Sequence, residues 1–166
     1  MLITIGIMVM IFCFSAQTRD KSNGLSEEIT KILIKIKRWL DSFIPATGKK
    51  EEFTEGTYSL FDDLNHYVRK LAHLTEFAFL GAALLSHFKA WSTYLDNKFT
   101  LLKMLWALLV GMLYAATDEI HQLFVSGRGA QLKDVMIDSC GVLLGILILR
   151  LIILKCDRKR AGGASS

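Results

Sequence analysis

Most side chains that could carry chemistry in this sequence lie at the ends of long apolar runs. They are grouped at helical spacing, with His73 and Glu76 three residues apart and Asp134 and Asp138 four residues apart. Residues at these spacings share one face of a helix. Charged groups at membrane depth are costly and usually face a bundle interior or a wet cavity, so they mark a candidate site.

A second group continues this pattern. Asp118 is followed by Gln122 one helical turn later, and Arg128 stands between two glycines in the next turn. An arginine guanidinium can hold a phosphate or carboxylate through two parallel hydrogen bonds. The set therefore predicts a non-enzymatic binding site for the anionic headgroup of a membrane lipid or lipid-linked precursor. The candidate ligand-binding residues are Ser15, Gln17, Lys70, His73, Glu76, Asp118, Gln122, Arg128, Asp134 and Asp138.

The same residues allow an alternative in which the protein is an intramembrane hydrolase or transferase acting on a lipid headgroup. His73 would be the general base, and Glu76 or Asp118 would orient it or act as the acid. Arg128 would stabilise a developing anion. Whether the protein is an enzyme stays open here. A transporter is less favoured because the chain has no inverted repeat and no broken-helix signature.

A metal site is conceivable but is not predicted. His73, Glu76, Asp118 and His121 are potential ligands, yet they do not form an HExxH motif and no thiolate accompanies them. We therefore predict no metal and no cofactor.

The composition is that of an integral membrane protein. The chain has 166 residues, of which 52% are hydrophobic, and a single proline. A single membrane domain over residues 1–166 is expected, because no linker or internal repeat divides the chain. The net charge of +4 reflects basic residues near the carboxyl-terminal end. Nothing in the sequence resembles a nucleic-acid-binding module.

Four apolar runs predict an all-α bundle of four transmembrane helices, at about residues 2–18, 71–88, 101–124 and 135–154. The uncharged part of the first run, residues 2–16, would form a helix only about 22 Å long. It must therefore include neighbouring polar residues or thin the bilayer. A cleaved signal peptide is the alternative, but the usual basic region before such a peptide is missing.

The first two runs are separated by a long polar loop, residues 19–70. Within it, apolar residues recur every three or four positions over about residues 25–44, which predicts an amphipathic helix. We slightly favour a position in the membrane interface, although packing over the bundle would produce the same pattern.

Basic residues follow the second and fourth runs, so the positive-inside rule places both termini in the cytoplasm. All four helices then deliver polar groups to the outer leaflet. Among these groups, Arg69, Glu119 and Lys133 are expected to be ordinary solvated residues at helix ends.

The order and spacing of these residues resemble the bacterial VanZ-like family over residues 3–154. The resemblance implies a protein of the bacterial cytoplasmic membrane and cell envelope. One namesake of the family is associated with low-level resistance to the glycopeptide teicoplanin. Asp138 is a departure, since we expect Asn at this position in many members. The matching motifs are S-x-Q (Ser15, Gln17), K-x-x-H-x-x-E (Lys70, His73, Glu76), Y-x-x-x-D-E-x-x-Q-x-F (Tyr114, Asp118, Glu119, Gln122, Phe124), Arg128, D-x-x-x-D (Asp134, Asp138) and G-x-x-x-G (Gly141, Gly145).

The G-x-x-x-G spacing allows two helices to approach closely. It is common by chance in apolar helices, so we expect Gly141 and Gly145 to serve packing within the molecule rather than a dimer. The sequence does not predict the oligomeric state.

Overall fold

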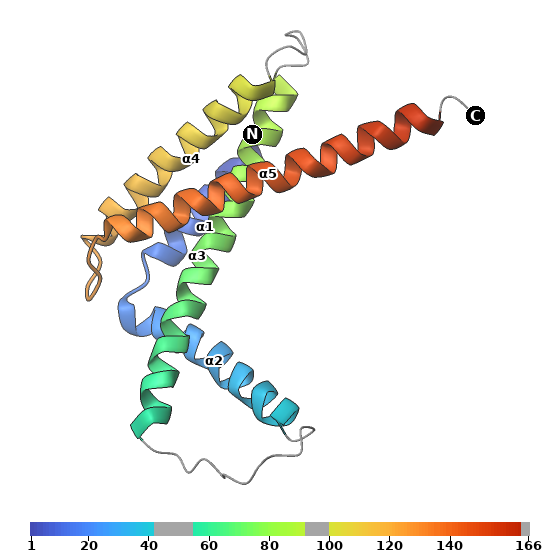
Figure 1. Cartoon of the computed structure of the whole chain (residues 1–166). Coiled ribbons are helices and arrows are strands. Elements are labelled where there is room, and N and C mark those ends of the chain that lie inside the picture. The colour runs from blue at the N-terminus through green and yellow to red at the C-terminus, as the bar shows by residue number, and fades with distance from the viewer. Residues whose placement is uncertain (42–54, 92–99, 164–166) are drawn as a thin grey trace.

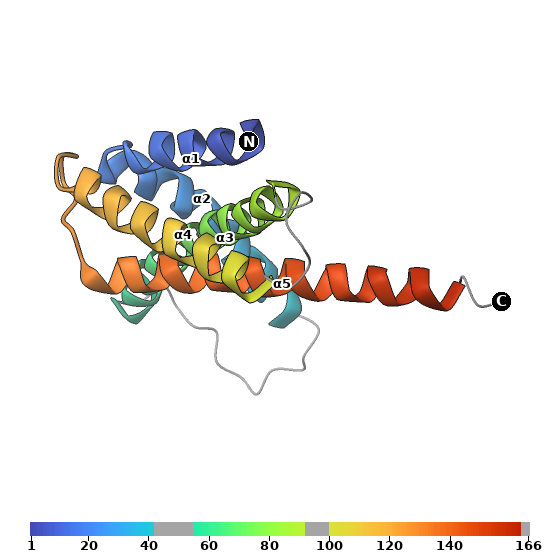
Figure 2. The same cartoon turned by 90° about the horizontal axis from the view of Figure 1, so that it is seen from above.

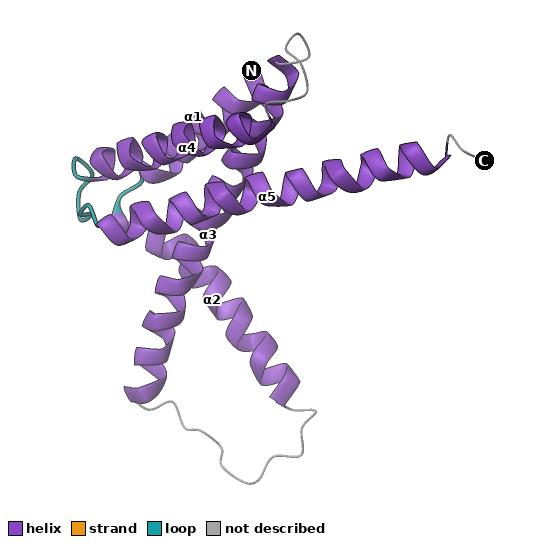
Figure 3. Ribbon diagram, turned by 45° about the horizontal axis from the view of Figure 1, so that its top comes forward, coloured by secondary structure: helices purple, strands orange, loops and turns teal. Residues whose placement is uncertain are grey.

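The computed structural model describes residues 1–41, 55–91 and 100–163, and this part of the chain contains helices and no strands (Figure 3). The predicted all-α class is therefore confirmed for these residues. The helices are α1 (Leu2–Ser15), α2 (Arg19–Asp41), α3 (Glu55–Trp91), α4 (Thr100–Gln122) and α5 (Leu132–Gly163).

Three of these helices, α3, α4 and α5, are long and apolar enough to cross a membrane. Most of their residues are not buried inside the bundle, and many of the exposed side chains are large and apolar. Such an outer surface is suited to lipid tails, and the helical backbone satisfies its own hydrogen bonds there. The chain is therefore a membrane protein. The apolar helix α1 has 14 residues and is only about 21 Å long, so the fourth span stays a prediction.

The helix boundaries differ from the edges of the apolar runs. α3 begins at Glu55, so the carboxyl-terminal part of the predicted loop 19–70 is helical. α1 and α4 end at Ser15 and Gln122, before the predicted span limits at 18 and 124. α5 continues to Gly163 through a basic segment. Hydrophobicity marks the part of a helix that suits lipid, whereas lysine and arginine are good helix formers that allow a helix to continue beyond it.

The helix α2 occupies the region of the predicted amphipathic helix. It begins at Arg19, six residues before the predicted start, and residues 42–44 at the predicted end lie outside the described residues. Thr30 is fully buried, and α2 packs against α3. Ile29, Leu33 and Ile36 are exposed, so much of the apolar stripe is not covered by the described part of the chain.

The centre of the fold is α3, which packs against each of the other four helices (Figures 1 and 2). α4 and α5 converge toward the loop that joins them, while α2 diverges from α3 at the opposite end of the molecule from the free end of α1 (Figure 1). The buried apolar core combines side chains from α1, α3, α4 and α5, including Ile11, Phe77, Ala107 and Val142.

Glycines allow α3 and α5 to approach each other closely. A Cβ atom at Gly145 would overlap the backbone carbonyl of Ala78, and one at Gly81 would overlap that of Val142. A Cβ atom at Gly141 would meet α3 in the same way. The G-x-x-x-G spacing therefore packs α5 against α3, which confirms the predicted packing within the molecule.

Candidate functional site

Polar side chains from four helices meet at one end of the bundle, beside the loop of residues 123–131. They come from the last turns of α1 and α4, the first turns of α5 and the middle of α3. The convergence that the spacing predicted is therefore present for most of the candidates. The structure brings together Ser15, Lys70, His73, Asp118, Gln122, Asp134 and Asp138.

Asp118 lies at the centre of the hydrogen bonds in this group and is only 3% exposed. Its Oδ2 atom accepts hydrogen bonds from Ser15 Oγ at 2.7 Å and from Gln122 Nε2 at 3.0 Å. Its Oδ1 atom is buried and has no hydrogen-bond partner among the described residues. One carboxylate oxygen is thus fixed by α1 and α4, and the other remains available.

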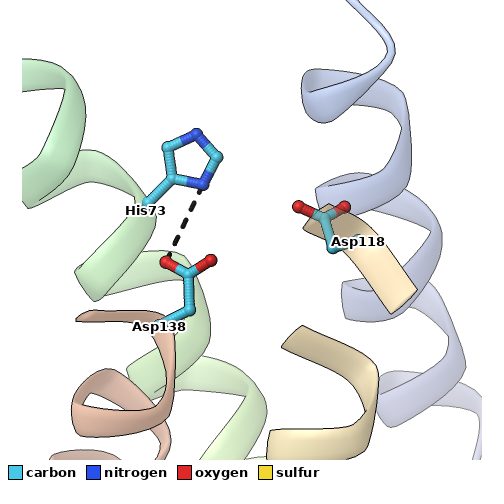
Figure 4. Close-up of side chains that lie close together, drawn as sticks. All are labelled: His73, Asp118 and Asp138. Carbon is cyan, nitrogen blue, oxygen red and sulfur yellow. Dashed lines mark ion pairs between the residues drawn. The ribbon is translucent and has the colours of Figure 1, made fainter. Parts of the chain in front are cut away.

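Two polar side-chain contacts connect α3 to α5 in this group. Lys70 Nζ lies 3.0 Å from Asp134 Oδ1, and His73 Nδ1 lies 4.0 Å from Asp138 Oδ1 (Figure 4 shows the second pair). The members of each helix are three or four residues apart, so the two contacts follow one another along the helix interface. The carboxylate of Asp138 is almost fully buried.

A pocket opens beside these contacts, between α3, the 123–131 loop and α5. Arg128 lies in its wall, between Gly127 and Gly129. Gly127 has a φ of 77°, in the left-handed region that favours glycine. The predicted ligand-binding residues that line the pocket are Lys70, His73, Gln122, Arg128, Asp134 and Asp138.

Arg128 and Lys70 differ in whether they form an ion pair. Whereas Lys70 is paired with Asp134, no carboxylate among the described residues lies within ion-pairing distance of Arg128. Burial lowers the pKa of the Arg128 guanidinium from its ordinary value, with Arg69 adding to the effect. An arginine stays protonated at neutral pH even so. The pocket therefore contains a half-buried positive charge with no ion-pair partner among the described residues, although Asp118, Glu119 and Glu76 lie near enough to raise its pKa.

Four predicted ligand-binding residues do not line the pocket. Two of them, Ser15 and Asp118, are joined by the buried hydrogen bond described above, and the other two are Glu76 and Gln17. Glu76 is half-buried on α3, one turn after His73, and Gln17 follows α1. Neither side chain makes a hydrogen bond or ion pair with another described residue. The structure gives them no direct part in the pocket.

The expectation that Glu119 is a solvated helix-end residue is wrong, and Arg69 lies within α3 rather than at its end. Glu119 is only 3% exposed, accepts a hydrogen bond from the backbone N–H of Gln131, and lines the pocket beside Arg69. Through this hydrogen bond, the end of the 123–131 loop contacts the last turns of α4 at Glu119. A signal was present in the sequence, because Glu119 shares a helix face with Gln122.

The metal ligands considered from the sequence are only partly brought together. The ring of His121 stacks on Phe12 with centroids 4.3 Å apart, on the α1 side of α4. Donor atoms of His73, Asp118 and Asp138 instead lie within 4.8 Å of one another. The structure therefore places Asp138, rather than Glu76 or His121, beside His73 and Asp118.

Comparison with known proteins places the whole site inside one matched segment. The family model described as VanZ/LLP1 matches residues 1–154, which contain every candidate residue. No curated protein and no solved structure matches the chain.

Proposed function

Because the chain belongs to the VanZ/LLP1 family, as its motifs predicted, we propose that it is a multi-pass protein of the bacterial cytoplasmic membrane that binds an anionic lipid-linked headgroup. The ligand is a membrane lipid or a lipid-linked cell-wall precursor at the outer leaflet. The observation that carries this proposal is Arg128, a half-buried cation that lines the pocket without a carboxylate partner among the described residues.

The surroundings of Arg128 support an anion as its ligand. A guanidinium presents donors in a fixed fork that matches two oxygens of a phosphate or carboxylate. Lys70 and Arg69 line the same pocket and add positive charge. Gln122, a neutral amide, is available to orient the uncharged part of the ligand. The part of the pocket beside Arg128 therefore favours a negatively charged group, while Glu119, Asp134 and Asp138 line the rest of it.

The size of the pocket limits what enters it. Its volume is about 90 Å³, well below the roughly 300–1,000 Å³ of sites for drug-sized ligands. Such a pocket accommodates a phosphate-sized part of the headgroup, while the rest of the ligand lies outside the pocket and its hydrocarbon chain stays beside the apolar outer surface of the helices. Sequestering or remodelling such a headgroup would change the target of a glycopeptide such as teicoplanin.

The topology that accompanies this function has four spans, with α1 as the fourth, and both ends of the chain in the cytoplasm. α1 packs against α3 and α4, next to helices long enough to cross the bilayer. α2 lies in the outer interface, with its exposed Ile29, Leu33 and Ile36 directed to the lipid. This arrangement opens the pocket toward the outer leaflet.

The test is binding of a short-chain polyprenyl phosphate to the purified protein in detergent, by isothermal titration calorimetry. We expect Arg128→Ala to weaken binding roughly 10- to 100-fold, because a hydrogen-bonded charge contributes about 1.5–3 kcal/mol. Arg128→Lys keeps the charge but loses the fork, and should lie between Arg128→Ala and the wild type. Lys133→Ala, which removes an exposed cation outside the pocket, is the matched control.

Two further ligands identify what is recognised. The uncharged polyprenol of the same length should bind much more weakly, and inorganic phosphate alone should compete if the headgroup carries the recognition. Equal affinity of wild type and Arg128→Ala for the polyprenyl phosphate would overturn the proposal. Teicoplanin susceptibility of cells that express each variant gives the corresponding envelope readout.

The enzymatic alternative is favoured by one observation, the position of His73 beside both Asp138 and the pocket. A histidine oriented by a carboxylate can act as a general base. The same titration mixtures, analysed by thin-layer chromatography, would reveal conversion of the polyprenyl phosphate. Turnover that is lost in His73→Gln would support a hydrolase or transferase, whereas binding without turnover supports the first function.

A further inference from the structure

We propose that His73, Asp118 and Asp138 form a binding site for one divalent transition-metal ion, with zinc as the best fit. This site goes beyond headgroup binding and does not depend on it. No local sequence motif predicted it, because its three ligands come from α3, α4 and α5.

The first support is the convergence of the donor atoms. Each residue contributes one nitrogen or oxygen atom, and these atoms all lie within 4.8 Å of one another (Figure 4). Zinc bonds to histidine and carboxylate are about 2.0–2.2 Å long, so donor atoms around one ion lie within about 4.4 Å of one another. The 4.0 Å between His73 Nδ1 and Asp138 Oδ1 fits this range. Small side-chain rotations would bring the whole set to bonding distance.

The second support is the unpartnered oxygen of Asp118. Its Oδ1 atom is buried without a hydrogen-bond partner among the described residues, in a side chain that is only 3% exposed. The carboxylate faces His73 and Asp138 (Figure 4). Buried polar atoms are nearly always satisfied, so an isolated carboxylate oxygen at this position points to a missing ligand.

The other oxygen of Asp118 is held in a way that suits a metal ligand. Ser15 and Gln122 both donate hydrogen bonds to Oδ2 and thereby fix the orientation of the carboxylate. Outer hydrogen bonds of this kind orient the ligands of metal sites and support metal affinity. Ser15 thus has a role in the site although it does not line the pocket.

The local charge also favours a cation. Asp118 and Asp138 are both buried and face the same space, where two negative charges would repel one another. The nearest lysine of the pocket, Lys70, is already paired with Asp134. A divalent ion between the two carboxylates would compensate both charges.

The donor set identifies the class of metal. One imidazole nitrogen with two carboxylate oxygens, and no thiolate, suits zinc or another borderline divalent ion and disfavours copper(I) and iron–sulfur clusters. Three protein ligands leave a coordination position open. Because His73 and Asp138 also line the pocket, that position would be reached from the pocket by water or by an anion.

The test is zinc binding to the full chain, purified in detergent, stripped with a chelator and dialysed. Equilibrium dialysis against zinc sulfate, with metal quantified by mass spectrometry, should give one zinc per chain. Asp138→Asn and His73→Gln should remove this zinc, whereas His66→Gln, which alters an exposed histidine of the same helix, should retain it. Ser15→Ala should weaken binding roughly 10- to 100-fold by releasing Asp118.

A second measurement uses only the wild type, in case a variant does not fold. Zinc should protect His73 from modification by diethylpyrocarbonate and leave His66 reactive. Failure of the folded wild type to bind zinc would overturn the proposal. So would zinc that is retained by both ligand variants, or equal modification of His73 with and without zinc. Arg128→Ala should bind zinc normally while losing the polyprenyl phosphate, so the two proposals can fail separately.

Discussion

At the scale of single residues, the difference between Lys70 and Arg128 decides which cation can recognise a ligand. Both were predicted to bind an anion, and both line the pocket. Lys70 is occupied by Asp134 at 3.0 Å, in a pair whose side chains are 24% and 33% exposed. Ion pairs with this degree of exposure are weak and are screened by salt. Arg128, with no such partner among the described residues, is the better candidate for tight headgroup binding.

The buried hydrogen bond between Ser15 and Asp118 predicts a loss of stability in Ser15→Ala. The change leaves a buried carboxylate short of a donor, which costs about 1–3 kcal/mol of unfolding free energy. The measurement is a thermal melt of the purified protein in detergent. Thr75→Ala is the control, because Thr75 donates only to a carbonyl of its own helix at an exposed position. Equal melting temperatures for wild type and Ser15→Ala would contradict the role of this bond.

At the scale of the helices, the contact of α3 with α5 limits the size of side chains at Gly145. A Cβ atom there overlaps the carbonyl of Ala78, so Gly145→Ala should force the helices apart. Overpacking of this kind typically costs about 1–3 kcal/mol. Gly6→Ala is the matched control in α1, where a Cβ would meet no atom within 4 Å of the described chain.

The two glycine variants should differ in their effect on the thermal stability of the protein. Gly6→Ala should be neutral or stabilising, because alanine is the better helix former by roughly 0.5–1 kcal/mol. Melts in detergent measure both, and size-exclusion chromatography of the same samples reports the oligomeric state. A change in oligomer with no change in melting temperature would instead indicate that Gly145 lies in an interface between chains.

At the scale of the whole molecule, the proposed topology predicts which parts of the chain are accessible from outside the cell. Ser126→Cys in the α4–α5 loop should react with a membrane-impermeant maleimide in intact cells, and Lys159→Cys near the end of α5 should react only after lysis. Cys13, Cys140 and Cys156 must first be replaced. The reverse pattern of labelling would mean that the pocket faces the cytoplasm.

Much of this architecture was predictable because helical spacing is a local property. The spacing of His73 with Glu76, and of Asp134 with Asp138, places each pair on a shared helix face whatever helices pack against it. The polar ends of four helices were also expected to meet. The family was recognisable from motifs that all fall inside the matched residues 1–154.

What could not be predicted depends on how helices far apart in sequence pack together. The bond from Ser15 to Asp118 joins residues 103 positions apart, and no local pattern encodes it. Glu119 is buried and bonded to the backbone of Gln131, 12 positions later in the chain. Asp138, and not Glu76, lies beside His73 because of the way α5 packs against α3. The start of α3 at Glu55 was missed because hydropathy does not mark where a backbone becomes helical.

The close glycine contacts between α3 and α5 have a consequence for the thermodynamics of ligand binding. Backbone that packs directly on backbone leaves few alternative arrangements, and the 123–131 loop ties α4 to the start of α5 within nine residues. We therefore expect the walls of the pocket to be ordered before any ligand arrives. Little conformational entropy remains to be lost on binding. Affinity should then be governed by how completely the pocket replaces the water around an anion, and structures with and without ligand should share one backbone conformation.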